Sequence, residues 1–193
     1  MIIKKLQEEN NHILRDQSLK ILLNGGVIIV PTDTIYGIIC DAQNPQAVEK
    51  IYQIKQRQYL KPLTIFTKNV QNIQKIAHIN QIERKIIDNF MPGALSLVLN
   101  KKENQIISPN INKNDETLSF RIPNHQFLLN LLEKIPYLAS SSANISGQKN
   151  LTNFKQVSQQ FTQNIDLLID AKTIDNHAST IVKVTNNIPE ILR

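Results

Sequence analysis

Short apolar runs alternate with amphipathic stretches along most of the chain. Residues 11–23 place leucine and isoleucine mostly at helical spacing, and the Asn-Gly-Gly that follows is typical of a helix end. Residues 27–31 (VIIVP) form a continuous β-branched run, which predicts a buried strand. A second short strand is expected near residues 35–40. Asn44 then suits an N-cap, with Pro45 in the first turn of a helix.

The same periodicities predict the remaining elements. Helices are expected near 69–77, 80–90, 125–135 and 153–161. Strands are expected over 62–67, 94–100, 117–123, 166–170 and 179–184, and residues 137–147 are expected to form a strand that runs into a loop of small polar residues. Residues 101–116 are expected to form a polar surface loop. Strands and helices mix without strict βαβ alternation, so we expect one α/β domain, residues 1–193, with a largely mixed sheet.

Composition narrows the class of protein. A chain of 193 residues is long enough for one ordinary domain. No apolar run is long enough to span a bilayer, and the N-terminus carries acids and amides where a signal peptide needs apolar residues. The single cysteine, Cys40, cannot form an internal disulfide, and no Cys/His spacing suits structural zinc. A reducing, cytoplasmic location is therefore expected.

Charge is unevenly distributed along the chain. The formal net charge is +6, but residues 50–85 carry eight basic side chains against one acidic, so this segment alone is +7 (8 − 1). Such a segment indicates an anionic partner, or else a merely basic face. The glycine-rich phosphate-binding motifs G-x-x-x-x-G-K-S/T and G-x-G-x-x-G are absent, so an anion must be bound by other groups.

Two polar clusters lie in the first third of the chain. Residues 31–37 (PTDTIYG) follow a buried strand, at the kind of strand end that commonly holds ligands. They could grip a small polar substrate, or they could form a plain β-turn. Lys55, Arg57 and Lys61 could bind phosphate, or they could complement the dipole at a solvated helix end.

Two further clusters lie in the second half. Arg121, on an alternating strand before a proline, suits a carboxylate clamp, although a surface-strand arginine is the alternative. Residues 140–147 (SSSANISG) could form an anion nest, with Ser179 and Thr180 adding hydroxyls, or could be an ordinary polar loop. The four histidines are scattered, and no Ser–His–Asp triad is forced.

Taken in order, these clusters resemble the YrdC-type threonylcarbamoyl-AMP synthases (TsaC), in their short single-domain form. The resemblance covers about residues 20–193 and rests on the motifs PTDTIYG, KQR with a following PL, PGALSLVL, FRIPNH, SSANISG and STIV. It implies a single YrdC-like domain, with a twisted mixed β-sheet, flanking helices and an open basic cavity. The sequence departs from the usual family pattern at Phe66, often histidine, and at Asn150, often serine.

The resemblance implies a nucleotidyltransferase that makes threonylcarbamoyl-AMP from L-threonine, bicarbonate and ATP with Mg²⁺, releasing pyrophosphate. Partner proteins would then transfer the threonylcarbamoyl group to a tRNA adenosine beside the anticodon. No protein nucleophile and no protein metal ligand are expected. The implied threonine ligands are Thr34, Arg121, Ser140 and Ser179. The implied ATP ligands are Lys55, Arg57, Lys61, Thr117, Ser142, Asn144 and Arg193.

A second hypothesis is a binding module of the same fold that holds double-stranded RNA or tRNA without synthase activity. It rests on the +7 segment and on a sequence pI near 9.4. With only four tyrosines, six phenylalanines and no tryptophan, little aromatic surface is available for stacking bases. A related carbamoyl-transfer domain, as in hydrogenase maturation, is a third alternative.

Overall fold

The computed structural model describes residues 2–7, 11–103, 106–113, 115–161, 163–171 and 177–193. Its helices are α1 (Asn11–Leu23), α2 (Pro45–Lys55), α3 (Val70–Ile76), α4 (Gln81–Phe90), α5 (Gln126–Leu132) and α6 (Phe154–Gln160), with a 3₁₀ turn η2 (Pro109–Ile111). Its strands are β1 (Ile2–Lys5), β2 (Ile28–Val30), β3 (Gly37–Asp41), β4 (Thr64–Phe66), β5 (Leu95–Asn100), β6 (Thr117–Arg121), β7 (Leu138–Ser142), β8 (Leu167–Asp170), β9 (Thr180–Thr185) and β10 (Ile188–Ile191).

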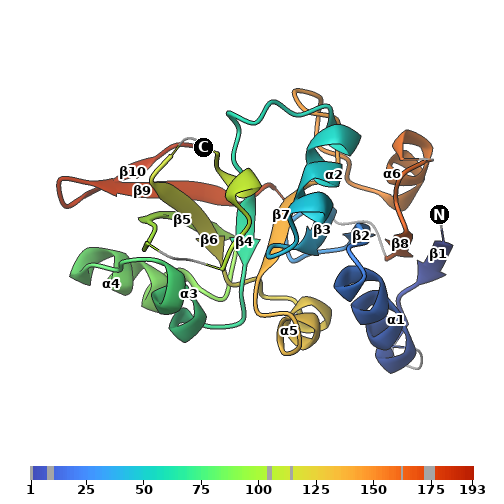
Figure 1. The fold of residues 1–193 in the computed structure, drawn as a ribbon, viewed down its shortest axis with the longest axis horizontal. Helices are drawn as coiled ribbons and strands as arrows, with labels where there is room; N and C mark the ends of the chain where they lie inside the picture. The colour runs from blue at the N-terminus through green and yellow to red at the C-terminus, as the bar shows by residue number, and fades with distance from the viewer. Residues whose placement is uncertain (1, 8–10, 104–105, 114, 162, 172–176) are drawn as a thin grey trace.

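All strands within the described residues belong to one twisted mixed sheet. Their order is β1-β8-β2-β3-β7-β4-β6-β5-β9-β10 (Figure 1). Four pairs are parallel, namely β1/β8, β8/β2, β4/β6 and β5/β9, and the other five are antiparallel. The mixed α/β architecture predicted from the sequence is confirmed.

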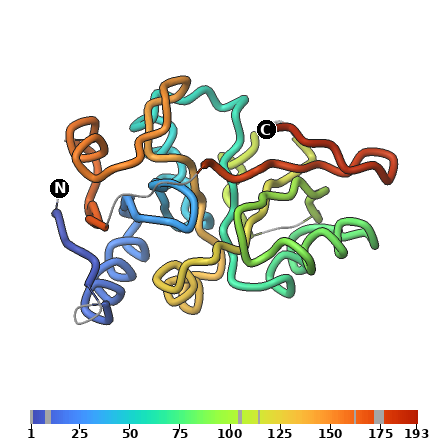
Figure 2. The backbone as a smooth tube through the Cα atoms, turned by 180° about the vertical axis from the view of Figure 1, so that it is seen from behind, coloured from blue at the N-terminus to red at the C-terminus, as the bar shows by residue number. Residues whose placement is uncertain are grey.

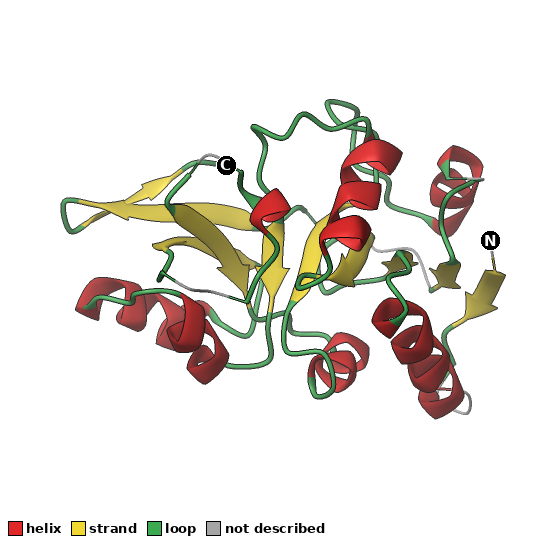
Figure 3. Ribbon diagram, viewed as in Figure 1, coloured by secondary structure: helices red, strands yellow, loops and turns green. Residues whose placement is uncertain are grey.

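Helices cover both faces of the central strands (Figure 3). Helices α1 and α5 pack with Ile28 and Val30 in one apolar cluster, whereas α2 and α6 pack with Val27 and Ile29 in the other. Successive side chains of a strand point to opposite faces, so a strand between two apolar layers needs apolar residues at every position. This requirement explains the uninterrupted VIIV run, all four residues of which are fully buried.

Helix ends follow their local sequence signals. The Asn44 side chain accepts a hydrogen bond from the Ala47 backbone at 3.0 Å, and thereby caps α2. Helix α1 ends where Gly25 adopts a φ of +73° and the Gly26 N–H reaches the carbonyl oxygen of Ile21 at 2.9 Å. These short-range contacts explain why the predicted helices lie close to the observed ones.

The sequence pattern missed both outer strands of the sheet. Strands β1 and β10 are exposed along their whole length, so they carry no alternation of apolar and polar residues. The expected surface loop 101–116 is also partly wrong, because it contains η2 and the buried Ile107 and Ile111.

Among the described residues, no helix is long and apolar enough to cross a membrane. Figure 2 shows the terminal segment with β9 and β10 returning toward the middle of the molecule.

Two adjacent leucines of α1 provide a test of this packing. Leu22 is fully buried, whereas Leu23 is 61% exposed. We expect Leu22→Ala to lower the free energy of unfolding by about 2–5 kcal/mol, because it removes apolar contacts and leaves a cavity. The matched change Leu23→Ala should cost no more than about 0.5 kcal/mol. Urea unfolding followed by circular dichroism measures both, and equal costs would contradict the assigned helix face.

Candidate active site

An open cavity of about 600 Å³, counting its mouth, lies against the middle of the sheet. Its walls come from the β2–β3 loop, the segment after α2, strands β4, β5, β6 and β7, the start of β9 and the C-terminal residue. Seven of the eleven residues predicted to bind ligands line it: Thr34, Arg57, Arg121, Ser140, Ser142, Ser179 and Arg193. The fold therefore joins motifs that are up to about 160 residues apart in the sequence.

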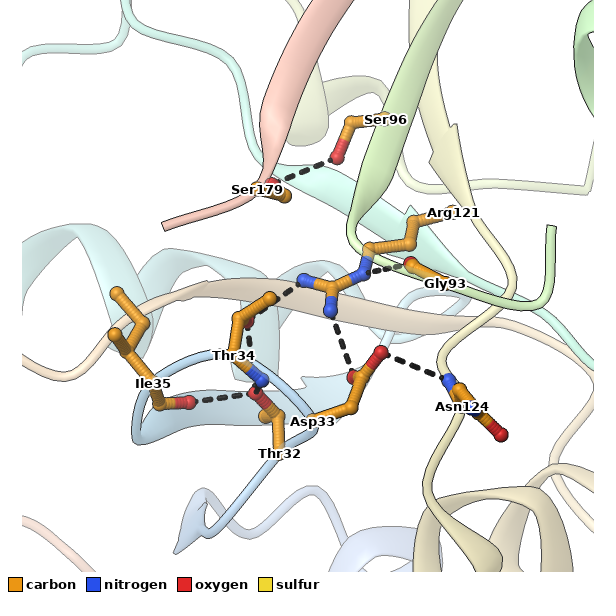
Figure 4. A network of polar contacts seen from close by, with 9 residues as sticks. All are labelled: Thr32, Asp33, Thr34, Ile35, Gly93, Ser96, Arg121, Asn124 and Ser179. Carbon is orange, nitrogen blue, oxygen red and sulfur yellow. Dashed lines mark hydrogen bonds and ion pairs between the residues drawn. The ribbon is translucent and has the colours of Figure 1, made fainter. Parts of the chain in front are cut away.

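Arg121 is the most constrained of these side chains (Figure 4). It lies at the end of β6 and is 3% exposed. Its Nε donates to the carbonyl oxygen of Gly93 at 2.9 Å, one terminal nitrogen donates to Thr34 Oγ1 at 3.0 Å, and the other pairs with Asp33 Oδ1 at 2.7 Å. Burial lowers the pKa of Arg121, while the charge of Asp33 opposes that shift. The guanidinium is therefore held in one orientation at the cavity wall.

The β2–β3 loop is fixed by its own hydroxyl groups. Thr32 Oγ1 donates to the carbonyl oxygen of Ile35 at 2.6 Å and accepts from the Thr34 N–H at 3.0 Å (Figure 4). Asp33, between the two threonines, also accepts a hydrogen bond from the Asn124 backbone at 3.0 Å. The chain bends over residues 33–35, and the two threonines line the cavity.

A pair of serines and the C-terminal arginine form another part of the wall. The buried hydroxyls of Ser96 and Ser179 lie 3.1 Å apart, on β5 and just before β9 (Figure 4). Arg193 donates from its guanidinium to the Ser179 carbonyl at 3.2 Å, and the Ile181 N–H donates to the Arg193 carbonyl at 3.0 Å. The β9–β10 hairpin thus returns the end of the chain to the cavity.

Arg57 supplies the third guanidinium of the cavity. Its Nε donates to the Lys61 carbonyl at 2.8 Å, and Nη2 donates to the Pro62 carbonyl at 2.9 Å. Burial lowers the pKa of Arg57 and that of Arg193, and the Arg193 charge lowers the pKa of Arg57 further. Burial and mutual repulsion both raise the free energy of three guanidinium cations in one cavity. A bound anion would compensate both costs by its attraction to the cations.

Four of the predicted ligands are not among the residues that line the cavity. Lys55 is fully buried behind it, and the Asn144 side chain bonds to Ser142 and Gln148. Thr117 lies at the start of β6, where its hydroxyl donates to Asp115 at 2.9 Å. Lys61 is exposed, and only its backbone carbonyl is engaged by Arg57. Thr117 shares a face of β6 with Arg121 but lies four residues before it, and Lys55 turns inward at the end of α2.

Other lining residues were not predicted as ligands. Ser96 and Thr32 line the cavity and lie in the motifs PGALS and PTDT. Their polar side chains within these motifs were the signal that could have identified them as lining residues. Phe66 lines the cavity below Arg121, with its ring centre 5.5 Å from the guanidinium carbon. Asn150 is exposed and is not a lining residue. Asp33 does not line the cavity. The sequence marks it only as a member of the PTDTIYG cluster and does not reveal its ion pair with Arg121.

Acidic and imidazole groups are scarce around the cavity. None of its lining residues has a carboxylate or an imidazole side chain. Throughout the described ranges, no group of three or more His, Cys, Asp or Glu side chains could hold a metal ion. The wall offers cations, hydroxyls and backbone groups, which suits binding and charge stabilisation of anions.

The basic side chains of the segment 50–85 have different surroundings. Lys50 donates to the Gly25 carbonyl at 2.9 Å, Lys68 pairs with Glu133 and Arg84 pairs with Asp88. Arg57 faces the cavity. Part of the +7 charge is therefore divided between the cavity, the interior, where Lys55 lies, and separate surface contacts.

The chain belongs to the Sua5/YciO/YrdC family. The family's sequence profile, described as "Telomere recombination", matches residues 20–193. A Methanocaldococcus jannaschii protein named "Putative threonylcarbamoyl-AMP synthase" is 36% identical over 186 residues, which cover 96% of this chain and 87% of that protein. The Bacillus subtilis threonylcarbamoyl-AMP synthase is 30% identical over 92% of this chain. The present chain spans only 52% of that relative.

Solved structures agree with this assignment. Pyrococcus abyssi Sua5 complexed with L-threonine is 29% identical, with a TM-score of 0.89 over 100% of this chain and 56% of its own. Escherichia coli YciO, at 19% identity, shares the fold with a TM-score of 0.87 over 93% of its chain. The family resemblance noted from the motifs is confirmed.

The buried ion pair at the cavity wall provides a second test. We expect Asp33→Ala to lower the free energy of unfolding by about 3–5 kcal/mol, because Arg121 stays buried without its partner. The control Asp88→Ala breaks the exposed pair with Arg84 and should cost about 1 kcal/mol or less. Thermal and urea unfolding measure both changes. An Asp33→Ala cost no larger than the control would show that the pair is dispensable.

Proposed function

We propose that this protein is an L-threonylcarbamoyladenylate synthase, which forms threonylcarbamoyl-AMP from L-threonine, bicarbonate and ATP. The observation that carries the proposal is the convergence of Arg57, Arg121 and Arg193 on one hydroxyl-rich cavity in a chain of this family. An amino-acid carboxylate and a triphosphate are both anions, so one cavity for both needs several cations. Relatives of this chain carry the name of that enzyme.

We assign the amino acid to the Arg121 side of the cavity. Arg121 would hold the threonine carboxylate, and Thr34, Ser140 and Ser179 would supply hydroxyl groups around it. The support is geometric: Asp33 and Gly93 already fix the guanidinium, so little freedom is lost on binding. The Pyrococcus abyssi relative solved with L-threonine makes this amino acid the first ligand to test.

We assign the triphosphate to the side of Arg57, Arg193 and Ser142. Arg57 can make a forked contact with phosphate oxygens, and Mg²⁺ would enter with ATP as part of the substrate. Lys61 lies close enough along the chain to add charge from the exposed loop. Lys55 and Asn144, also expected from the motifs, would act from behind the wall, and Thr117 would act from the start of β6.

The chemistry needs positioning and charge stabilisation more than a protein nucleophile. The neutral amine of threonine attacks the carbon of bicarbonate, and loss of water leaves a carbamate. A carbamate oxygen then attacks the α-phosphorus of ATP, and the bond to the β,γ-diphosphate breaks to release pyrophosphate. Negative charge accumulates in the second step, where the guanidinium groups would stabilise it.

The product would serve tRNA modification. We propose that residues 1–193 form one YrdC-like domain in the cytoplasm, and that partner proteins move the threonylcarbamoyl group to the adenosine beside the anticodon. The support is the family and the continuity of the sheet from β1 to β10. Threonylcarbamoyl-AMP is a reactive mixed anhydride, so an acceptor must follow it closely.

Pyrophosphate release tests the activity directly. With ATP and Mg²⁺ present, we expect release only when L-threonine and bicarbonate are both added, because the nucleophile is their carbamate. A coupled pyrophosphatase assay measures it, with the product identified by mass spectrometry. ATP turnover that does not respond to threonine would refute the proposal.

Arg57→Ala tests the triphosphate assignment. We expect kcat/KM for ATP to fall roughly 10- to 150-fold, because a charge-assisted hydrogen bond contributes about 1.5–3 kcal/mol. Arg84→Ala is the matched control, since Arg84 lies on α4 and pairs with Asp88. Its kinetics should equal those of the unmodified protein. Unchanged ATP kinetics for Arg57→Ala would remove this residue from the site.

A further inference from the structure

The side chain of Lys55 is fully buried although it carries an amine. Lys55 is the last residue of α2 and is 0% exposed. Its Nζ donates to the backbone oxygen of Ser142, to that of Asn144 at 2.6 Å and, more weakly, to Asn144 Oδ1 at 3.4 Å. Burial, and to a smaller extent the nearby charge of Arg57, together lower the pKa of Lys55 to about 7. A buried amine at this cost needs a structural or functional reason.

The three acceptors belong to the last residue of β7 and to the loop that follows it. Within this segment, Ser142 Oγ donates to Asn144 Oδ1 at 2.5 Å, and Asn144 Nδ2 donates to the Gln148 carbonyl at 2.6 Å. The Ser146 N–H in turn donates to the backbone carbonyl of Lys55 at 3.0 Å. The end of α2 and the loop are therefore joined by hydrogen bonds in both directions.

The helix end separates Lys55 from Arg57. Gln56 takes a left-handed conformation with φ of 49°, and the Arg57 N–H returns to the Tyr52 carbonyl at 2.9 Å. This reversal leaves Lys55 pointing inward, whereas Arg57 and Ser142 line the cavity. Two cations two residues apart therefore have different surroundings, and only one of them faces a ligand.

We propose that Lys55 is a positioning residue, which acts on ATP through Ser142 and does not touch the phosphates itself. Its amine holds the backbone on either side of Ala143, and thereby sets the direction of the Ser142 hydroxyl beside Arg57. The inference rests on the proposed function for its kinetic consequence. Its structural part, the anchoring of the loop by the amine, can be measured without any activity.

A double-mutant cycle on ATP kinetics tests the coupling. We expect Lys55→Met to raise KM for ATP about 10-fold or more with a smaller change in kcat, and to leave KM for threonine nearly unchanged. In a Ser142→Ala background the same change should have less than a threefold further effect, because the group that it positions is gone. If the increases in KM for ATP of the two single variants multiply in the double variant, Lys55 acts on ATP independently of Ser142, and the proposal is overturned.

Lys50→Met is the matched control. Lys50 lies on the same helix, and its amine also donates to a backbone carbonyl, that of Gly25, but it is not one of the lining residues. We expect Lys50→Met to leave both KM values unchanged. A rise in KM for ATP as large as that of Lys55→Met would show a general effect of losing a lysine from α2, and would overturn the proposal.

Amide hydrogen exchange separates the anchoring from the activity. Lys55→Met should speed exchange at the N–H groups of Asn144, Ser146 and Gln148 at least 10-fold, while β7 residues keep their protection. Unchanged exchange would overturn the proposal even if the enzyme is active. Faster exchange in a protein without threonine-dependent pyrophosphate release would support the anchoring and refute only the proposed function. If Lys55→Met does not fold, Lys55→Gln replaces it in the kinetic and hydrogen-exchange measurements.

Discussion

The buried pair of Arg121 and Asp33 is the constraint on which the cavity depends. A guanidinium that is 3% exposed is stable only if carboxylate and carbonyl oxygens surround it. Those oxygens come from the β2–β3 loop and from the turn before β5, which are far apart in the sequence. The hydrogen bonds of one buried cation therefore join three segments, namely the β2–β3 loop, the turn before β5 and the end of β6. Strands β4, β7 and β9 supply the remaining wall residues.

The surroundings of each basic side chain say more about its role than the net charge of the segment does. The basic segment from residue 50 to residue 85 indicated an anionic partner or a merely basic face, and four of its members have separate surroundings. Arg57 reaches the cavity, Lys55 ties a loop to a helix, and Lys68 and Arg84 form exposed pairs. The surface pairs contribute little to stability. The cations that line the cavity are those that burial holds near one another.

Elements that carry a complete local signal were predictable, and elements that depend on a distant partner were not. The run from Val27 to Val30 and the cap at Asn44 encode their structure within a few residues. Strands β1 and β10 have no buried face, and they become strands only because β8 and β9 offer free edges for pairing. Ile107 and Ile111 were placed in a surface loop because their burial comes from packing contacts with distant parts of the chain.

The sequence by itself determined the family, the mixed α/β class and the polar clusters that surround the cavity, because short motifs and periodicities are local properties. Only the tertiary structure decided which members of those clusters face a common space. Lys55 and Arg57 illustrate the difference, since one left-handed residue at Gln56 sends the first into the interior and the second to the wall. Side-chain direction depends on how the helix end packs against the loop after β7, and that contact spans almost ninety residues.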